Sequence, residues 1–218
     1  MLFWIDYLYN LSGYLHWGLN YYAGDPYTQE GISKDLPLGD RAIVYPGKEG
    51  LLGSLRFSAQ RDGIQDFECL RLLEQALREV KSRAGPEAYW LDPRQRPLEL
   101  CRRVIWSFHD YTRDNRIMLE TRQAIAEEIE ALQVEPAVVV QTSPPEGTVV
   151  PAGPRAIIVR GLAPPGSKVT VNGEPAKLRP SGYFSRATFL GDRQPAVTVD
   201  VERAGSRTTA TRTFRLTD

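Results

Sequence analysis

Apolar residues recur every three to four positions in four stretches of the first 133 residues, a spacing that predicts helices. The first helix carries Phe3 and Tyr7 and is expected to end at Ser12-Gly13. The second runs from Ser54 to about Ala84 and has an apolar stripe of Ile64, Phe67, Leu70, Leu73, Leu77 and Val80. The other two are expected at about 98–108 and 114–132.

Beyond residue 136 the pattern changes to short apolar segments that turn residues separate, which predicts strands. The expected strands are Val138–Gln141, Ala156–Arg160, Lys168–Val171, Tyr183–Thr188, Ala196–Glu202 and Thr208–Leu216. The dipeptide Asn172-Gly173 favours a two-residue type I′ hairpin. Short strands at this spacing predict a small antiparallel sandwich.

The composition shifts at the same place. Ten of the sixteen prolines lie from Pro136 onward, whereas all four tryptophans and nine of the ten tyrosines precede it. We therefore expect an α+β protein with one domain over residues 1–133 and an all-β domain over residues 134–218.

The segment Tyr14–Tyr22 is the first candidate for function, because it holds four aromatic rings, one imidazole and one amide. Its first five residues are expected to form a short strand, which Gly18 ends. The same rings could equally fill a core, since aromatic side chains dominate cores. Residues 23–54 form a long loop with a single expected strand at Arg41–Tyr45.

Charge excludes some classes of partner. Lys+Arg and Asp+Glu both number 27, so the chain lacks the basic excess expected for binding nucleic acid or an anionic membrane. The apolar N-terminal stretch has no basic start, and polar residues interrupt it, so it fits neither a signal peptide nor a membrane span. Cys69 and Cys101 are expected to be buried free thiols.

No complete catalytic set is visible in the sequence. His16 and His109 are too far apart to suggest a local metal pair, and neither a phosphate loop nor a dinucleotide fingerprint occurs, so no metal or cofactor is expected. Asp62 and Asp66 share one helical face beside Arg61, where a structural ion pair or cap is the expected role.

Several motifs nevertheless occur in an order typical of one family. They read Gly13-Tyr-Leu-His-Trp-Gly-Leu-Asn-Tyr-Tyr22, Asp25-Pro-Tyr27, Gly39-Asp40, Val44-Tyr-Pro-Gly47 and Ser54-Leu-Arg-Phe-Ser-Ala-Gln-Arg-Asp-Gly-Ile-Gln-Asp-Phe-Glu68. Over about residues 1–132 the chain resembles the C-terminal part of glycoside hydrolase family 123-like proteins. It departs from the family pattern at His16, Tyr22 and Gln65. The tail after Pro136 resembles bacterial Ig-like modules.

The resemblance implies a fold and a site. Such enzymes have a (β/α)8 barrel, of which residues around Trp17 would be the last strand, and sites of this fold lie at the C-terminal ends of the strands. Trp17 would then stack on a sugar ring, Asn20 and Tyr22 would bind hydroxyl groups, and His16 and Asp40 would border the pocket. Leu15 and Leu19 would belong to the core.

The resemblance also implies a catalytic mechanism whose key residues are missing from this sequence. The family's characterised enzymes are retaining β-N-acetylgalactosaminidases that use the substrate's acetamido group as nucleophile, which an adjacent Asp-Glu pair orients. No Asp-Glu dipeptide occurs in the 218 residues. We therefore expect a C-terminal fragment of a secreted or cell-surface enzyme with a glycan substrate, no catalytic residue and no hydrolysis of its own.

Two other hypotheses remain open from the sequence. The chain could be a non-catalytic carbohydrate-binding or spacer protein in which the Ig-like tail is the working part, or a stable helical scaffold. In the fragment hypothesis the edge and the rings of the last strand would be uncovered, so the isolated chain should expose apolar surface or aggregate.

Overall fold

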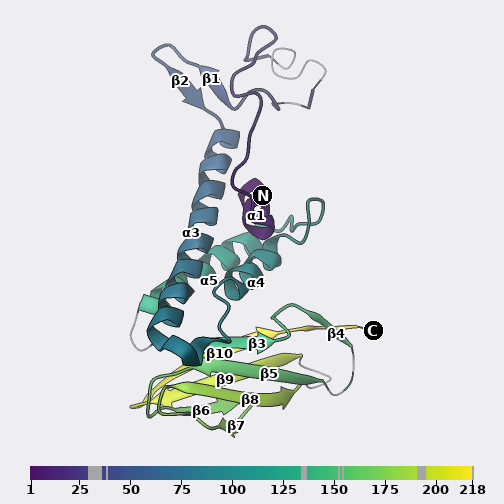
Figure 1. Ribbon diagram of the computed structural model, residues 1–218. Helices are drawn as coiled ribbons and strands as arrows, with labels where there is room; N and C mark the ends of the chain where they lie inside the picture. The colour runs from purple at the N-terminus through teal and green to yellow at the C-terminus, as the bar shows by residue number, and fades with distance from the viewer. Residues whose placement is uncertain are drawn as a thin grey trace. The chain divides into compact units, whose positions relative to one another are not determined.

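The computed structural model describes residues 1–28, 36–37, 39–133, 137–151, 153, 155–190 and 195–217 (Figure 1). It is an α+β protein, as the sequence predicts. Two compact units divide the chain, Met1–Glu68 and Cys69–Asp218, and the division falls inside helix α3.

The first unit begins with helix α1, Leu2–Tyr9. Asn10 ends it in the left-handed conformation, with φ of 55°, and its N–H bonds back into the last turn. The helix therefore ends two residues before the predicted Ser12-Gly13. Trp4 is fully buried, and its indole Nε1–H donates to the Oδ2 of Asp66 at 2.8 Å.

Helix α3, Leu55–Ala84, has the predicted length, and Gly63 does not break it. An ideal Cβ at position 63 would lie 2.6 Å from the Cδ2 of Phe3, so glycine lets α1 approach this helix closely. Asp66 is buried against Trp4, and Asp62 pairs with Arg61 at 2.8 Å. Both carboxylates are engaged in contacts within the unit, as expected for structural residues.

The predicted strand over residues 14–18 does not form. The nearest strand-like pairing is a single bridge between Asn20 and Ala42. The neighbouring strands, β1 (Val44–Pro46) and β2 (Leu51–Gly53), pair with each other and not with residues 14–18. A strand without a partner leaves its backbone groups unpaired. The prediction of core positions for Leu15 and Leu19 is also wrong, since their exposed fractions are 90% and 51%.

In the second unit, three helices follow the end of α3: η1, Gly85–Ala88; α4, Gln95–Val104; and α5, Asn115–Gln133. Of the predicted stripe, Leu70, Leu73, Leu77 and Val80 are buried, whereas Ile64 is 47% exposed. Helix α4 starts and ends earlier than predicted. At Ile105 the backbone becomes extended and pairs with Tyr111.

The strands of the second unit form two larger sheets and one parallel pair. The three-stranded sheet has the order β3-β5-β8, the four-stranded sheet the order β10-β9-β6-β7, and β11 pairs with β4. The strands are β3 Val139–Ser143, β4 Val149–Pro151, β5 Ala156–Leu162, β6 Lys168–Val171, β7 Glu174–Ala176, β8 Tyr183–Phe189, β9 Ala196–Arg203, β10 Ser206–Thr213 and β11 Arg215–Thr217.

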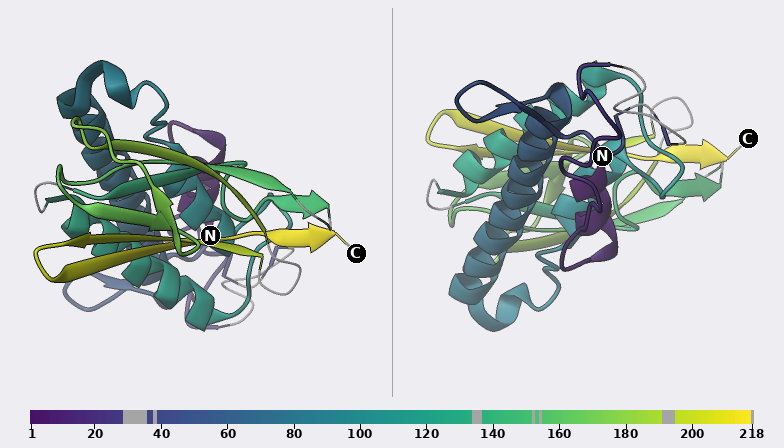
Figure 2. Two further views of the ribbon diagram at one scale, coloured as in Figure 1. Left: turned by 90° about the horizontal axis from the view of Figure 1, so that it is seen from below. Right: turned by 90° about the horizontal axis from the view of Figure 1, so that it is seen from above.

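Both larger sheets, whose strands Figure 2 shows from two further directions, contribute to one buried core. Ile157, Val159 and Phe184 enter it from the first sheet, and Val171 and Val199 from the second. The predicted hairpin is present, with φ of 49° at Asn172 and 80° at Gly173 joining β6 to β7.

The predicted boundary between residues 133 and 134 adjoins residues 134–136, which lie outside the described residues, so it stays a prediction. Within the second unit, helices and strands are bonded to each other. The N–H of Asp92 donates to the side chain of Gln141, which donates in return to the Asp92 carbonyl. Cys101 is buried as predicted, whereas Cys69 is exposed.

No helix in the described ranges is long and apolar enough to cross a membrane. No group of three or more His, Cys, Asp and Glu side chains there could hold a metal ion.

Candidate functional site

Backbone hydrogen bonds bring two segments of the first unit together. The N–H of Tyr21 donates to the carbonyl of Arg41 at 3.0 Å, and the N–H of Ile43 donates to the carbonyl of Leu19 at 2.9 Å. Residues 19–21 therefore run antiparallel beside residues 41–43. This pairing carries the aromatic segment to Asp40, which immediately precedes the second segment.

His16, Trp17 and Asp40 form a connected cluster. The indole Nε1–H of Trp17 donates to the Oδ2 of Asp40 at 3.0 Å, and the Nε2 of His16 lies 3.8 Å from the Oδ1. The His16 and Trp17 rings are stacked, with their centroids 6.5 Å apart and 22° between the planes. One carboxylate thus faces both rings.

The contacts of His16 also define which nitrogen carries its proton. Its Nδ1 accepts the backbone N–H of Gly18 at 3.3 Å, so the proton of the neutral ring lies on Nε2, which faces Asp40. Gly18 itself is buried, and an ideal Cβ there would lie 3.1 Å from the Cα of Arg41. A glycine at this position therefore permits the close approach of the two segments.

An open cavity of about 530 Å³ adjoins this cluster. That volume lies within the range of about 300–1,000 Å³ typical of small-molecule sites. His16 and Asp40 contribute polar groups to it, and Phe3 and Ile43 contribute apolar ones. The remaining lining residues are Met1, Leu2, Tyr14, Pro37, Gly39, Arg56, Ala59 and Gln60.

Tyr14 is a lining residue that sequence reasoning assigned to a strand rather than to the site. Burial, and then the charges of Asp40 and Asp6, raise the pKa of its hydroxyl. The phenol therefore stays protonated at neutral pH and remains a hydrogen-bond donor. Its ring also meets Phe3 edge-on, at 5.8 Å between centroids.

Arg56 and Gln60 are lining residues that the sequence analysis missed altogether. Arg56 donates from Nε and Nη2 to the carbonyl of Ala42, at 3.0 and 2.8 Å, and from Nη2 to the hydroxyl of Tyr45 at 2.7 Å. Four-residue spacing places Arg56 and Gln60 on one face of α3. The four-residue spacing can be read from the sequence, but it does not show which face of α3 lines the cavity.

Of the five predicted residues, His16 and Asp40 line the cavity, whereas Trp17, Asn20 and Tyr22 are not among its described lining residues. The Tyr22 hydroxyl donates to the carbonyl of Val44, and its ring stacks on that of Tyr45, with 6.2 Å between the ring centroids. Burial, followed by Tyr45 and Tyr27, raises the pKa of Tyr22. Asn20 pairs with Ala42 through the backbone bridge.

The described lining of this cavity combines aromatic, imidazole and carboxylate side chains. Asp40 is the one carboxylate among the described residues that line this cavity. Hydrolysis of a glycosidic bond needs a general acid together with a nucleophile or a positioned acetamido group. An aromatic ring, an imidazole and a carboxylate are instead the side chains that position a polyhydroxylated ring.

Comparison with known families supports a carbohydrate-related assignment. Residues 1–73 match the family model described as "Glycoside hydrolase 123, catalytic domain". This part of the chain is glycoside hydrolase family 123-like. The match contains all five predicted site residues, and it covers about a third of the 218 residues.

Other comparisons add no argument. No curated protein matches the chain. The crystal structure of an engineered protein is similar at 21% sequence identity over 46% of this chain and 27% of its own length. Its TM-score of 0.27 is too low to indicate a shared fold.

Proposed function

We propose that the first unit forms one wall of a sugar pocket in a glycoside hydrolase-like protein of the β-N-acetylhexosaminidase type. The observation that carries the proposal is the cluster of His16 and Trp17 on the carboxylate of Asp40, in which His16 and Asp40 line a cavity of about 530 Å³. The family match over residues 1–73 supports a glycan as the ligand.

In this proposal each residue has a definite task. Trp17, a residue that is 54% exposed, presents a surface on which a pyranose face packs. Asp40 accepts from sugar hydroxyl groups, and the Nε2–H of His16 donates to them. Asn20 and Tyr22 act from outside the cavity, where they hold residues 19–22 against residues 42–44.

The catalytic carboxylates are proposed to come from residues other than these 218. The family's retaining, substrate-assisted mechanism needs an adjacent Asp-Glu pair, and the sequence has none. We therefore expect no turnover of an aryl β-N-acetylhexosaminide by this chain. Release of the aryl group by the purified 218-residue protein would contradict this assignment.

Binding is the direct test of the pocket wall. The chain is titrated calorimetrically with the methyl β-glycosides of N-acetylgalactosamine and N-acetylglucosamine. Trp17→Ala and Asp40→Ala should each weaken binding at least tenfold, which corresponds to about 1.4 kcal/mol. Tyr89→Ala, which removes a 75% exposed ring in the second unit, is the matched control and should leave the affinity unchanged.

For the rest of the protein the proposal follows the resemblance. Residues 1–133 would complete a (β/α)8 barrel together with its closing helices, and residues 134–218 would be an Ig-like module. The common core of the two larger sheets supports the second part. The whole protein would act outside the cell or at its surface, where glycans are its substrates.

A further inference from the structure

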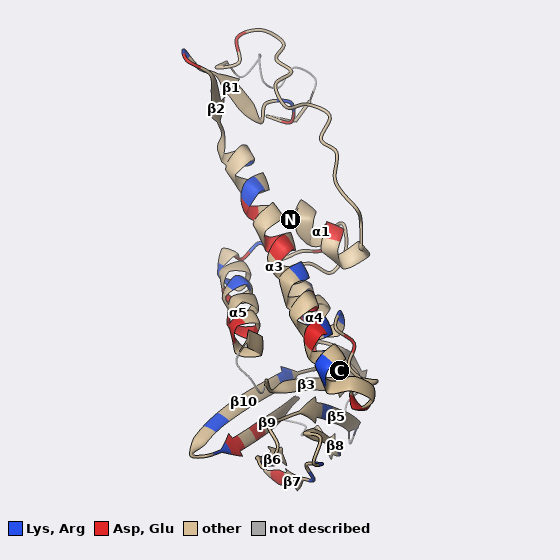
Figure 3. Ribbon diagram, turned by 60° about the vertical axis from the view of Figure 1, so that its left-hand side comes forward, with Lys and Arg blue, Asp and Glu red and all other residues tan. Residues whose placement is uncertain are grey.

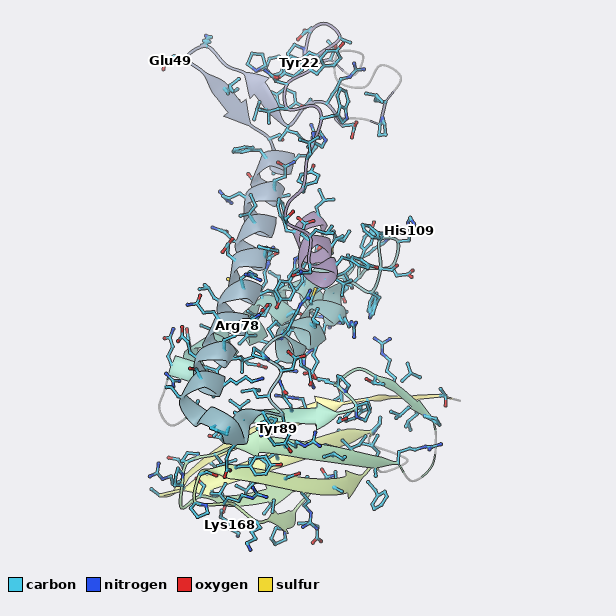
Figure 4. All side chains as sticks on the ribbon, in the orientation of Figure 1. Tyr22, Glu49, Arg78, Tyr89, His109 and Lys168 are labelled. Atoms are coloured by element: carbon cyan, nitrogen blue, oxygen red, sulfur yellow. The ribbon has the colours of Figure 1, made fainter. Side chains whose placement is uncertain are left out.

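A second aromatic surface lies in the second unit, on the loop that follows α4. Trp106, Phe108 and Tyr111 are 41%, 55% and 40% exposed. The loop is closed by the bridge between Ile105 and Tyr111 and by the N–H of Trp106, which donates to the Asp110 carbonyl at 2.8 Å. His109 lies on the same loop (Figure 4). These contacts hold the rings on an ordered support.

A cavity of about 200 Å³ adjoins Trp106. It lies between the end of α4 and the segments around β4 and β11, and Arg102, Arg103, Glu146 and Arg215 line it. The volume is below the range of about 300–1,000 Å³ typical of drug-sized ligands. It therefore suits a single ring rather than an extended chain.

A network of charges adjoins this cavity, and its members Glu99, Arg103 and Glu146 are lining residues. Arg96 pairs with Glu99, Glu128 and Glu146, and Arg103 also pairs with Glu146, at 3.2 Å. Arg212, which is buried, lies in the electrostatic field of the same three carboxylates. Three carboxylates are thus balanced by three guanidinium groups, and Figure 3 shows both signs of charge on α4 and α5.

Two further cations remain after this balance. Arg102 and Arg215 line the cavity and have no ion pair in the described part of the chain. Arg215 lies over the ring of Trp106, with 5.8 Å from Cζ to the ring centroid. That distance is close to the outer limit of about 6 Å for a cation–π contact, so the guanidinium can still bind an anion.

A structural role accounts for part of this arrangement. Arg102 and Arg103 lie in the last turn of α4, where cations stabilise the helix dipole by about 0.3–1 kcal/mol. It does not account for Arg215, which starts β11, or for the exposed Trp106 beside it. A surplus of two positive charges around an aromatic face is complementary to a ring that bears an acidic group.

We propose that the cavity between Trp106, Arg102 and Arg215 binds one acidic sugar ring, either a uronate or a sulfate ester. The carboxylate or sulfate lies between the two guanidinium groups, and the apolar face of the ring packs on the indole. Nucleic acid is a less suitable ligand, because a protein that binds its backbone contacts many phosphate groups. The described lining of this cavity offers only Arg102 and Arg215 as cations without an ion pair. The site is independent of the pocket proposed in the first unit.

The test uses the intact chain and its indole N–H signals in nitrogen-15 NMR, with the Trp106 signal assigned from Trp106→Phe. Methyl β-glucuronide and galactose 6-sulfate are titrated separately, alongside neutral methyl β-glucoside, sodium sulfate and an oligo-glutamate peptide. We expect a saturable shift of the Trp106 signal with at least one acidic sugar, at an affinity at least tenfold above that of the glucoside. Whichever acidic sugar binds identifies the acid group.

Variants separate a binding role from a packing role. Arg102→Gln and Arg215→Gln should each weaken acidic-sugar binding at least fivefold while the other indole signals stay in place. Arg203→Gln, an exposed arginine at the end of β9, should have no effect.

Three outcomes would overturn the proposal. They are no shift of the Trp106 signal, equal affinity for the glucoside, and equal affinity for sodium sulfate or the peptide. The Trp17 signal reports the first-unit pocket separately, so the two proposals fail independently.

Discussion

Phe184 packs directly on Gly161, and an ideal Cβ at position 161 would lie 2.2 Å from the Cζ of that ring and 2.6 Å from the Val139 carbonyl oxygen. The ring is fully buried in the core of the two larger sheets, so it has no room to move away. Gly161→Ala should therefore lower the free energy of unfolding by about 1–3 kcal/mol, the usual cost of overpacking a core. Urea denaturation measures it.

A control and a rescue make this prediction specific. Gly24→Ala, where nothing lies within 4 Å of the added Cβ, should leave stability unchanged. Phe184→Leu in the Gly161→Ala background should recover part of the loss, because it removes the clashing end of the ring. Equal stability of Gly161→Ala and the wild type would show that the core is looser than described.

For single residues, the sequence predicts which side chains contact one another at the first site better than it predicts which side chains are buried. Trp17, His16 and Asp40 were predicted together, and the structure joins them around one carboxylate. Leu15 was predicted to be core and is 90% exposed. Alternation along a strand decides burial only when a partner strand exists, and here the partner segment is three residues long.

At the scale of elements, Arg96 joins α4 to α5 and to the segment before β4 through Glu128 and Glu146. Burial alone would raise the pKa of Glu146, but the charges of Arg96, Arg103 and Arg212 together lower it. A carboxylate whose pKa is lowered on folding stabilises the folded state above its unfolded pKa of about 4.3. That contribution is lost as the pH falls through the lowered, folded value.

Glu146→Gln should therefore destabilise the protein at pH 7 by about 1.5–3 kcal/mol, the value of a hydrogen bond to a charged group. The difference from the wild type should shrink as the pH falls from 5 to 3, because Glu146 of the wild type becomes protonated, whereas the other carboxylates titrate in both proteins and cancel in the difference. Urea denaturation at pH 7, 5 and 3 measures it. If the difference were the same at all three pH values, the stabilising contribution of Glu146 would not depend on its charge.

Long helices and the hairpin are the elements that the sequence predicts best. Periodicity locates α3 and α5 almost to the residue, and Asn172-Gly173 locates the β6–β7 turn. The strands β2, β4 and β7 were missed, and each has three residues, too few to show alternation. These three segments form strands because of the strands they pair with, and not because of a pattern in their own sequences.

At the scale of the whole molecule, large apolar side chains of the first unit are exposed to an unusual degree. Leu15 and Leu55 are 90% and 89% exposed, and Leu51, Tyr27 and Tyr21 are 65%, 63% and 62% exposed. A single exposed apolar residue is normal, but several in one 68-residue unit favour surfaces that another segment covers. The chain should therefore bind 1-anilinonaphthalene-8-sulfonate while folded and self-associate as its concentration rises.

Fluorescence of the bound dye and sedimentation velocity check this expectation. The double variant Leu15→Ser, Leu55→Ser should reduce both dye binding and self-association without loss of helical circular dichroism. A monomeric wild type that does not bind the dye would contradict the view that these surfaces are uncovered.

The sugar-pocket wall is tested most directly by the indole N–H signal of Trp17, because this N–H donates to Asp40, which lines the cavity. The intact chain is titrated with the methyl β-glycosides of N-acetylgalactosamine and N-acetylglucosamine and followed by nitrogen-15 NMR. We predict a saturable shift of this signal that Asp40→Ala abolishes and Tyr89→Ala leaves unchanged. An unchanged Trp17 signal at saturating sugar, or an equal shift in Asp40→Ala, would contradict the account.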